Sequence, residues 1–353
     1  MVGRFRVLGV DLRVEGPPDV VASISVAYER FKIPANPATP HHRVTVAAGM
    51  PDAEMLLYQR FLATVLLHVE PLAVFHGAAL VDRAGGALVL AGPSGHGKSS
   101  LSLALVERGF GFLGDDYAPV DLASGTVWPF PRTASVLPGG TAPVPEPVRR
   151  LAEDRTAPRL FGKTLVDIGK AFGPAALRST PAPLRTVVVL GPADAEADVS
   201  YLHLASRAAD GPRVGAALRA IPGVVVEDED ATGGRCRWRL RIEHAAGPTE
   251  ALGALVEDEA VLYSERTWSG PPDFTEAPSA SELKRREAAV LLTRELLNRR
   301  RGSRFLEGRA DGIAGIVLDV AQALRPARCW RVRVGRFGET VDLLERLTER
   351  SAA

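Results

Sequence analysis

The amino-acid sequence predicts an α/β protein (α+β elements) with a mixed sheet in its core, a small β-rich addition before the core and a helical addition after it. Three observations predict this class. Short apolar runs bounded by glycine recur between residues 71 and 190, a run of apolar residues at helical spacing precedes them, and three longer helical patterns follow residue 280. At 353 residues the chain is long enough for two domains, or for one large α/β domain with appendages.

Residues 1–70 are expected to form a segment of strands followed by a helix. Apolar and polar residues alternate in short bursts from Phe5 to Val10 and from Val20 to Val26, which predicts a few strands separated by proline-rich turns. Along residues 53–69 the apolar residues recur at helical intervals, and this predicts a helix that Pro71 ends.

Residues 71–268 are expected to form the core. Two apolar runs, 73–81 and 87–91, flank Asp82-Arg83-Ala84-Gly85-Gly86, which predicts a hairpin that leads into a glycine-rich loop. A helix is predicted from Ser99 through Val106. A buried strand over 110–113 then ends at a pair of aspartates, Asp115 and Asp116.

The second half of the core carries weaker patterns. A second hairpin is predicted over 117–122 and 126–130, and a further buried strand over 185–190. Proline, glycine and charge make 137–158 an irregular surface segment or mobile loop. The acidic run 227–230 is expected to be a solvated loop rather than a metal site.

A proline-rich stretch, 268–278, marks a boundary before a C-terminal helical region with a terminal strand, 269–353. Helices are predicted over 281–300, 310–324 and 339–350, and a strand over 329–334. This region lacks a chemical motif, so completion of the sheet, formation of a homo-oligomer and docking of a substrate all stay open. Its basic cluster favours a solvated helix end, with an acidic leader peptide as the alternative ligand: Arg294, Arg299, Arg300, Arg301, Arg304 and Arg309.

Composition limits the partners and the compartment. The chain is 46% hydrophobic and 24% charged with a net charge of +1, so its overall charge gives no reason to expect nucleic acid. Its two cysteines, Cys236 and Cys329, lie far apart, which excludes a disulfide scaffold and predicts a reducing compartment. There is no signal-peptide core and no run of about 20 apolar residues. We therefore expect a cytoplasmic protein without a membrane partner.

Residues 92–99 form a complete G-x-x-x-x-G-K-[ST] phosphate-binding motif. Its glycines let backbone N–H groups turn toward a polyphosphate, Lys98 supplies a mobile cation, and the Ser99 hydroxyl supplies an oxygen for Mg²⁺. A dinucleotide site is disfavoured because Ser100 stands where G-x-G-x-x-G needs its third glycine. The motif predicts that ATP with Mg²⁺ is bound by Gly92, Pro93, Ser94, Gly95, His96, Gly97, Lys98, Ser99 and Ser100.

The order of motifs around this loop resembles a known family. His76-Gly77, a hairpin, the loop, a helix, Arg108-Gly109, a strand and then Asp115-Asp116 resemble the catalytic domain of HPr kinase/phosphorylase, and more closely the HPr-kinase-like proteins that phosphorylate peptides such as lasso-peptide precursors. The resemblance covers about residues 70–135. It implies a P-loop core of the HPr-kinase/PEP-carboxykinase type and an ATP-dependent kinase that modifies a serine or threonine of a peptide or protein, including ribosomal peptide precursors.

The resemblance also implies roles for single residues. Asp115 would act on the acceptor hydroxyl as a base, and His76 would lie close enough to tune it. Because a hydroxyl is a poor nucleophile, a carboxylate that orients it and takes its proton suits this chemistry. The residues themselves suggest two further roles: Asp116 can hold Mg²⁺ directly or through water together with Ser99, and Arg132, which follows the second hairpin, either reaches the transferring phosphate or is an ordinary surface arginine.

Three departures from the family bear on the reaction. The part before His76 is too short for the N-terminal domain of the HPr enzymes, Ser100 replaces an acid, and their phosphorolysis signature has no counterpart. A one-way kinase is therefore favoured. A small-molecule alcohol kinase and a non-kinase P-loop ATPase or nucleotide-dependent binding module are the alternatives, although L-S-G-G-Q-like and N-K-x-D motifs are both missing from the sequence.

Overall fold

The computed structural model describes the chain except for residues 35–40, 51, 94, 138–142, 161–162, 192–198, 233, 248, 257, 259, 268–272, 300–301, 308, 310 and 353. It divides into two compact units. The first comprises Met1–Gly92, Gly97–Leu190 and Asp273–Ala353, and the second comprises Pro93–His96 with Gly191–Pro272. The predicted division at residues 70 and 268 stays a prediction.

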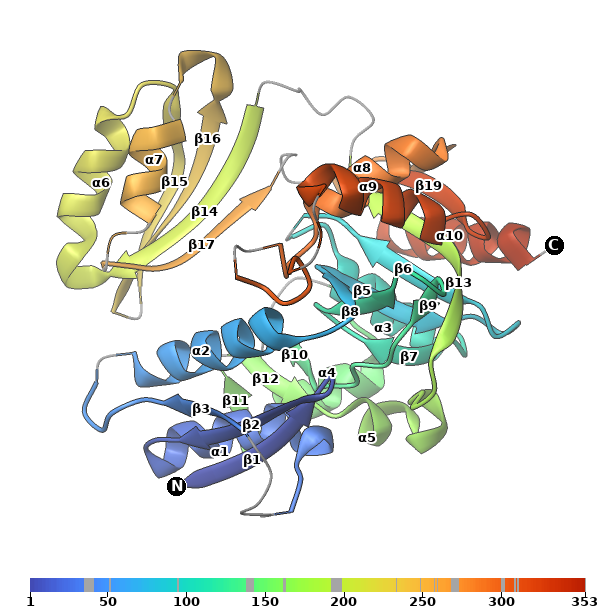
Figure 1. Ribbon diagram of the computed structural model, residues 1–353, viewed down its shortest axis with the longest axis horizontal. Coiled ribbons are helices and arrows are strands. Elements are labelled where there is room, and N and C mark those ends of the chain that lie inside the picture. The colour runs from blue at the N-terminus through green and yellow to red at the C-terminus, as the bar shows by residue number, and fades with distance from the viewer. Residues whose placement is uncertain are drawn as a thin grey trace. The chain divides into compact units, whose positions relative to one another are not determined.

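A curled mixed sheet forms the centre of the first unit (Figure 1). Strand β13 holds it together, because the start of β13 pairs antiparallel with β9 and its later residues pair parallel with β6 and β19. Among the described residues nine strands join this sheet: β4 (Ala73–Phe75), β5 (Gly77–Val81), β6 (Ala87–Ala91), β7 (Gly111–Gly114), β8 (Ala118–Asp121), β9 (Thr126–Val127), β13 (Ala182–Leu190), β18 (Ser279–Glu282) and β19 (Arg328–Arg333). Both predicted hairpins are confirmed, as β5–β6 and β8–β9.

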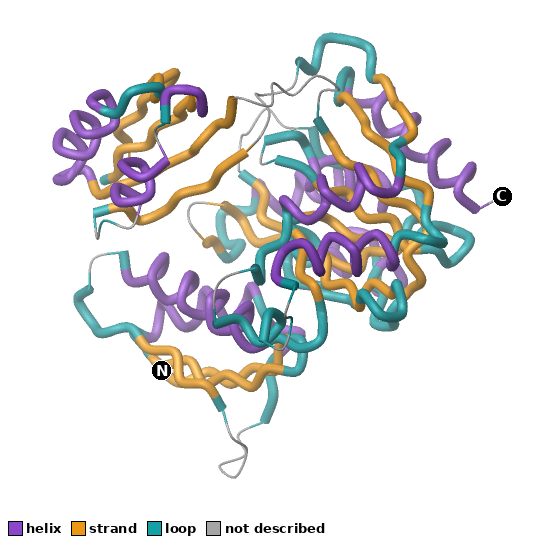
Figure 2. Tube along the Cα trace, turned by 45° about the horizontal axis from the view of Figure 1, so that its top comes forward, coloured by secondary structure: helices purple, strands orange, loops and turns teal. Residues whose placement is uncertain are grey.

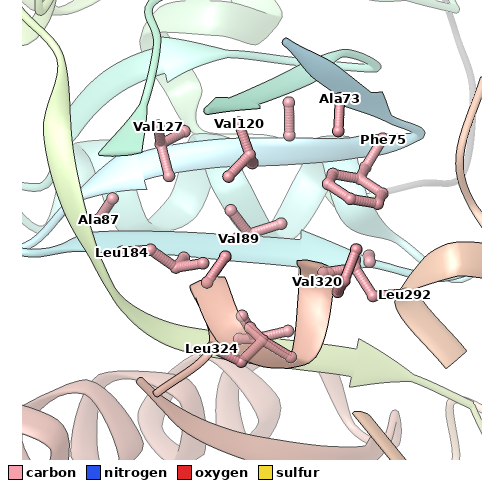
Figure 3. Packing of buried hydrophobic residues seen from close by; sticks show 14 of the residues in the cluster. Ala73, Phe75, Ala87, Val89, Val120, Val127, Leu184, Leu292, Val320 and Leu324 are labelled. Carbon is pink, nitrogen blue, oxygen red and sulfur yellow. The ribbon is translucent and has the colours of Figure 1, made fainter. Parts of the chain in front are cut away.

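Helices cover both faces of this sheet. Helices α3 (Lys98–Glu107) and α10 (Phe337–Ala352) pack on one face, whereas α8 (Arg285–Arg294) and α9 (Gly312–Ala323) pack on the other. Figure 3 shows the second face, where Val89 of β6 and Leu184 of β13 lie near Val320 of α9. Every residue of β6 is buried as a result, which explains why its sequence reads as a continuous apolar run instead of alternating.

The N-terminal part of the first unit, residues 1–68, forms a small layer of strands and helices, here called the N-terminal layer. Strands β1 (Val2–Val7), β2 (Val10–Glu15) and β3 (His42–Thr45) form a sheet in that order, and α2 (Ala53–His68) confirms the predicted helix. The strand predicted over 20–26 is wrong, since Pro18–Ala27 form helix α1. Pro18 suits the first turn of a helix, and Val20, Val21, Ile24 and Ala27 bury one helical face.

The segment predicted to be irregular, 137–158, contains a helix. Helix α4 (Glu146–Glu153) follows Pro145 and buries Val148 and Ala152, while residues 138–142 lie outside the described part of the chain. The prediction failed because two buried residues four positions apart are a weak pattern in a charged background. A small sheet follows, in the order β10 (Ala134–Val136), β12 (Lys163–Val166), β11 (Arg159–Leu160), and then α5 (Ile168–Phe172).

The first predicted C-terminal helix is shorter than expected. Strand β18 takes residues 279–282, and α8 ends at Arg294 rather than at 300. Beyond α8 the chain runs beside β4, where the Asn298 side chain accepts from the Val74 N–H at 3.0 Å and donates to the Leu72 carbonyl at 2.8 Å. These buried bonds satisfy backbone groups that a longer helix would leave unpaired. The predicted strand (β19) and the last two predicted helices (α9 and α10) are confirmed.

The second unit is a four-stranded antiparallel sheet with two helices on one face (Figures 1 and 2). Its strands are β14 (Val199–Arg207), β15 (Val224–Thr232), β16 (Arg235–Glu243) and β17 (Val261–Thr267), and its helices are α6 (Gly211–Ala220) and α7 (Thr249–Val256). The acidic run 227–230, predicted to be a loop, belongs to β15. Its carboxylates pair with arginines, as Glu227 does with Arg239 at 3.2 Å, so strand pairing and solvation coexist there.

Candidate active site

The phosphate-binding motif joins strand β6 to helix α3. Gly92 has φ 144° and Gly97 has φ 80°, values that favour glycine. A Cβ on Gly92 would lie 2.7 Å from the Leu190 carbonyl oxygen, so a larger residue would also collide with β13. Gly97 is the N-cap of α3, and within the described residues no side chain caps this end. Its first-turn N–H groups are therefore suited to an anion.

Lys98 and Ser100 are buried in the first turn of α3, and the Lys98 ammonium donates to the Gly92 carbonyl at 2.6 Å. The lysine therefore folds back over the start of the loop. Pro93, Gly95 and His96 belong to the second unit, where Gly95 has φ 82° and the His96 N–H donates to the Pro93 carbonyl at 3.4 Å. Ser94 lies outside the described residues.

Asp115 follows strand β7 and reaches the start of α3. The Ser99 hydroxyl of the phosphate-binding motif lies close enough to this carboxylate to lower its pKa, so the strand end and the motif come together here. The side chain is only 2% exposed. Burial, with the neighbouring negative charge of Asp116 adding to it, raises the pKa of the Asp115 carboxyl to about 6.

Asp116 occupies a left-handed backbone conformation, φ 64°, which is unusual for a residue with a side chain. The Gly77 N–H donates to its carbonyl at 3.3 Å, and its carboxylate pairs with the Arg132 guanidinium. Burial opposes ionisation of this carboxyl, but attraction by Arg132, with smaller contributions from His76 and Lys98, leaves its pKa below the usual range. The two neighbouring carboxyls therefore have opposite pKa shifts.

Arg132 lies beneath the aspartate pair rather than on the surface. It is 3% exposed, and besides the Asp116 carboxylate its guanidinium contacts the Asp115 carbonyl at 3.4 Å and the Tyr58 hydroxyl at 3.4 Å. The guanidinium also lies 5.5 Å from the centre of the Tyr117 ring. The structure thus joins Arg132 to both aspartates.

His76 lies between β4 and β5, half-buried, with its backbone N–H donating to the Glu295 carbonyl at 2.7 Å. His76 contributes to the lowered pKa of Asp116. The predicted effect of His76 on Asp115 stays a prediction.

Sequence reasoning missed two residues of this site. Tyr58 comes from helix α2 and contacts Arg132, and Lys163 comes from the start of β12 and contributes to the lowered pKa of Asp116. Neither residue stands in a motif. A tyrosine within an amphipathic helix and a lysine at a strand start are ordinary features of any sequence, so only the fold reveals them.

These groups fit a Mg²⁺–triphosphate. The uncapped helix start and Lys98 suit phosphate oxygens, while the Ser99 hydroxyl and the ionised Asp116 offer the oxygen ligands that Mg²⁺ prefers. Oδ1 of Asp115 is buried without a hydrogen-bond partner among the described residues. In that same part of the chain no three His, Cys, Asp or Glu side chains gather to hold a metal.

Comparisons with known proteins give little beyond this geometry. No family model and no curated protein match the chain. Among solved structures, the HPr(Ser) kinase/phosphatase from Coxiella burnetii is similar at 20% identity, over 34% of this chain and 67% of that one, with a TM-score of 0.25. At this level the likeness assigns no function. Among the described residues no helix is long and apolar enough to cross a membrane.

Proposed function

We propose that the chain is an ATP-dependent kinase that transfers the γ-phosphate to a serine or threonine hydroxyl of a peptide or protein. One observation carries the proposal. The buried Asp115 carboxylate lies close to the Ser99 hydroxyl of the phosphate-binding motif, although the two residues are distant in sequence. A carboxylate at this position lies where the donor phosphate and an acceptor hydroxyl would meet.

The donor side consists of the helix start, Lys98 and the metal ligands. The first-turn N–H groups of α3 and the Lys98 ammonium would bind phosphate oxygens. The Ser99 hydroxyl and the Asp116 carboxylate would hold Mg²⁺, which would supply neutralisation of charge on the phosphates. Arg132 fixes Asp116 in its ionised form by pairing with it.

The acceptor side depends on Asp115. Its carboxylate orients the acceptor hydroxyl and takes its proton as the hydroxyl oxygen bonds to the γ-phosphorus and the bond from that phosphorus to the ADP oxygen breaks. Burial shields this carboxylate from water, so the protein itself sets its orientation. The products are ADP and a phosphorylated side chain, and the proton leaves Asp115 to solvent.

The peptide or protein acceptor rests on the motif order from His76 to Asp116, which resembles that of HPr-kinase-like proteins. The test is incubation of the protein with Mg-ATP and peptides encoded near its gene, followed by mass spectrometry for the mass of one phosphate. We expect a phosphorylated serine or threonine with the wild type and none with Asp115→Asn. Phosphate transfer to small alcohols, or ATP hydrolysis alone, would contradict the peptide-kinase proposal.

A further inference from the structure

The guanidinium of Arg132 is held by three acceptors that come from different parts of the chain. The Asp116 carboxylate and the Asp115 carbonyl belong to the turn after β7, and the Tyr58 hydroxyl belongs to α2. A planar guanidinium carries five N–H donors in fixed directions, so its orientation is set by the acceptors around it. Because Arg132 is buried, water cannot readily replace these acceptors.

The turn that Arg132 holds is unfavourable by itself. Asp116 has φ 64°, a conformation that costs free energy for any residue with a Cβ. Such a conformation persists when its surroundings hold it. Here the surroundings are the Gly77 N–H on the Asp116 carbonyl and Arg132 on the carboxylate.

Tyr58 brings the N-terminal layer to this turn. Its helix packs through Phe61 on Tyr28, with ring centres 4.6 Å apart, and the Phe31 ring lies 5.1 Å from Phe130, two residues before Arg132. The aromatic packing joins α2 to the segment between β9 and β10 that carries Arg132. The Tyr58 hydroxyl therefore contacts the guanidinium from helix α2, whose position this packing holds.

We propose that Tyr58 is a positioning residue: it holds the Arg132 guanidinium, and through it the Asp116 carboxylate, in the orientation that the site uses. Its effect on catalysis rests on the kinase function proposed above, whereas its effect on Arg132 does not. The N-terminal layer is then part of the catalytic apparatus and not only a support, since one of its hydroxyls sets the geometry of the aspartate pair.

The first test is the kinetics of Tyr58→Phe, which removes only the hydroxyl. We expect kcat to fall about tenfold, the loss that corresponds to one hydrogen bond to a charged group, while KM for ATP changes less than about twofold. Thr64→Ala is the matched control, because it removes a hydroxyl of the same helix that donates to the Arg60 carbonyl. An unchanged kcat in Tyr58→Phe, or an equal loss in Thr64→Ala, would overturn the proposal.

Combining Tyr58→Phe with a second substitution, Asp116→Asn, distinguishes positioning of Arg132 from a merely structural role of Tyr58. If Tyr58 acts through Arg132 on Asp116, the tenfold loss disappears when Tyr58→Phe is added to Asp116→Asn. A loss that persists undiminished in the double variant would show that Tyr58 acts by another route.

The last test needs no enzymatic activity. The free energies of unfolding of Tyr58→Phe, Arg132→Lys and the double variant are compared by denaturant titration, and we expect them to be non-additive. If Arg132→Lys does not fold, Asp116→Asn replaces it, because the Asp116 side chain is 35% exposed. Additive effects would overturn the proposal. If the wild type transfers no phosphate but coupling is found, the kinase proposal fails while the positioning of Arg132 stands.

Discussion

The candidate site of the first unit buries its charged side chains, whereas the described ion pairs of the second unit, like Arg336–Glu339 elsewhere in the first, lie at the surface. At the candidate site the first unit buries Lys98, Asp115 and Arg132, each less than 10% exposed. In the second unit the described acid–arginine pairs lie at the surface. Arg213 pairs with Asp258 at 2.9 Å, and the two side chains are 57% and 30% exposed. Arg237 and Asp230, 3.2 Å apart, are about half exposed.

This difference separates functional charge from solvating charge. Removing a charge from water costs several kcal/mol unless its partners compensate, so three buried charges in one place indicate a site that the fold maintains at a cost. Pairs exposed to water contribute little to stability and are screened by salt. The comparison therefore predicts large effects for changes in the first group and small effects for changes in the second.

Asp115→Asn tests the comparison most severely. Loss of the carboxylate that takes the acceptor proton should lower the rate of phosphate transfer about 1,000-fold. Asparagine keeps the shape of the side chain and a carbonyl oxygen near Ser99, so ATP affinity should change less than about threefold. Initial rates by mass spectrometry and affinities by calorimetry check both statements. Full activity in this variant would contradict the assignment of Asp115 as base.

Arg132→Ala breaks a buried pair and leaves Asp116 without its cation. We expect the free energy of unfolding to fall by about 3 kcal/mol, toward the lower end for a broken buried pair because Asp116 keeps some contact with water. Denaturant titration measures it. Arg178→Ala, which removes an arginine outside the described contacts of the aspartate pair, is the control. A loss below about 1 kcal/mol would mean that the buried guanidinium is not a structural element of the site.

Lys98→Ala removes the cation of the phosphate-binding motif. We expect ATP affinity to fall about tenfold or more and phosphate transfer to fall with it, because charge-assisted hydrogen bonds to phosphate are lost. Calorimetry with Mg-ATP provides the measurement. Lys284→Ala, at an exposed lysine before α8, should bind ATP like the wild type. Equal affinities for all three proteins would refute the nucleotide site.

Arg213→Ala should have the smallest effect. The hydrogen bond from Arg213 is the main cause that lowers the pKa of Asp258 to about 2, so the substitution should raise that pKa toward its ordinary value near 4. A carboxyl with a lowered pKa stabilises the fold above its unfolded pKa and loses this contribution as pH falls toward 2. The variant should therefore match the wild type below about pH 2.

NMR titration of Asp258 measures this pKa, and thermal unfolding at pH 7 should show only a small drop in Tm, because the pair is exposed to solvent. A drop in Tm at pH 7 as large as that of Arg132→Ala would show that a surface pair of the second unit contributes as buried pairs do, and the contrast would not hold.

Short-range patterns in the sequence predict much of the secondary structure of the first unit. The apolar run before Gly92, the hairpins around it and helix α3 form from neighbouring residues and agree with the prediction, except that the run 73–81 is divided into β4 and β5 at His76. The patterns gave the wrong secondary structure where contacts with residues distant in the sequence determine it. Val20 to Val26 suit a strand by composition, yet a proline at the helix start and one buried face make α1. The acidic run 227–230 pairs as a strand because arginines of β16 lie opposite it.

By itself, then, the sequence determined the phosphate-binding motif and the aspartate pair, because the constraints on a glycine-rich turn, a helix start and a strand end are local. Only the tertiary structure decided what surrounds Asp116. Arg132 pairs with it, Tyr58 contacts that arginine from α2, and His76 and Lys163 add to its lowered pKa from other elements. Such convergence depends on how sheets and helices pack, and the spacing of residues along a chain does not encode the direction in which a buried side chain points.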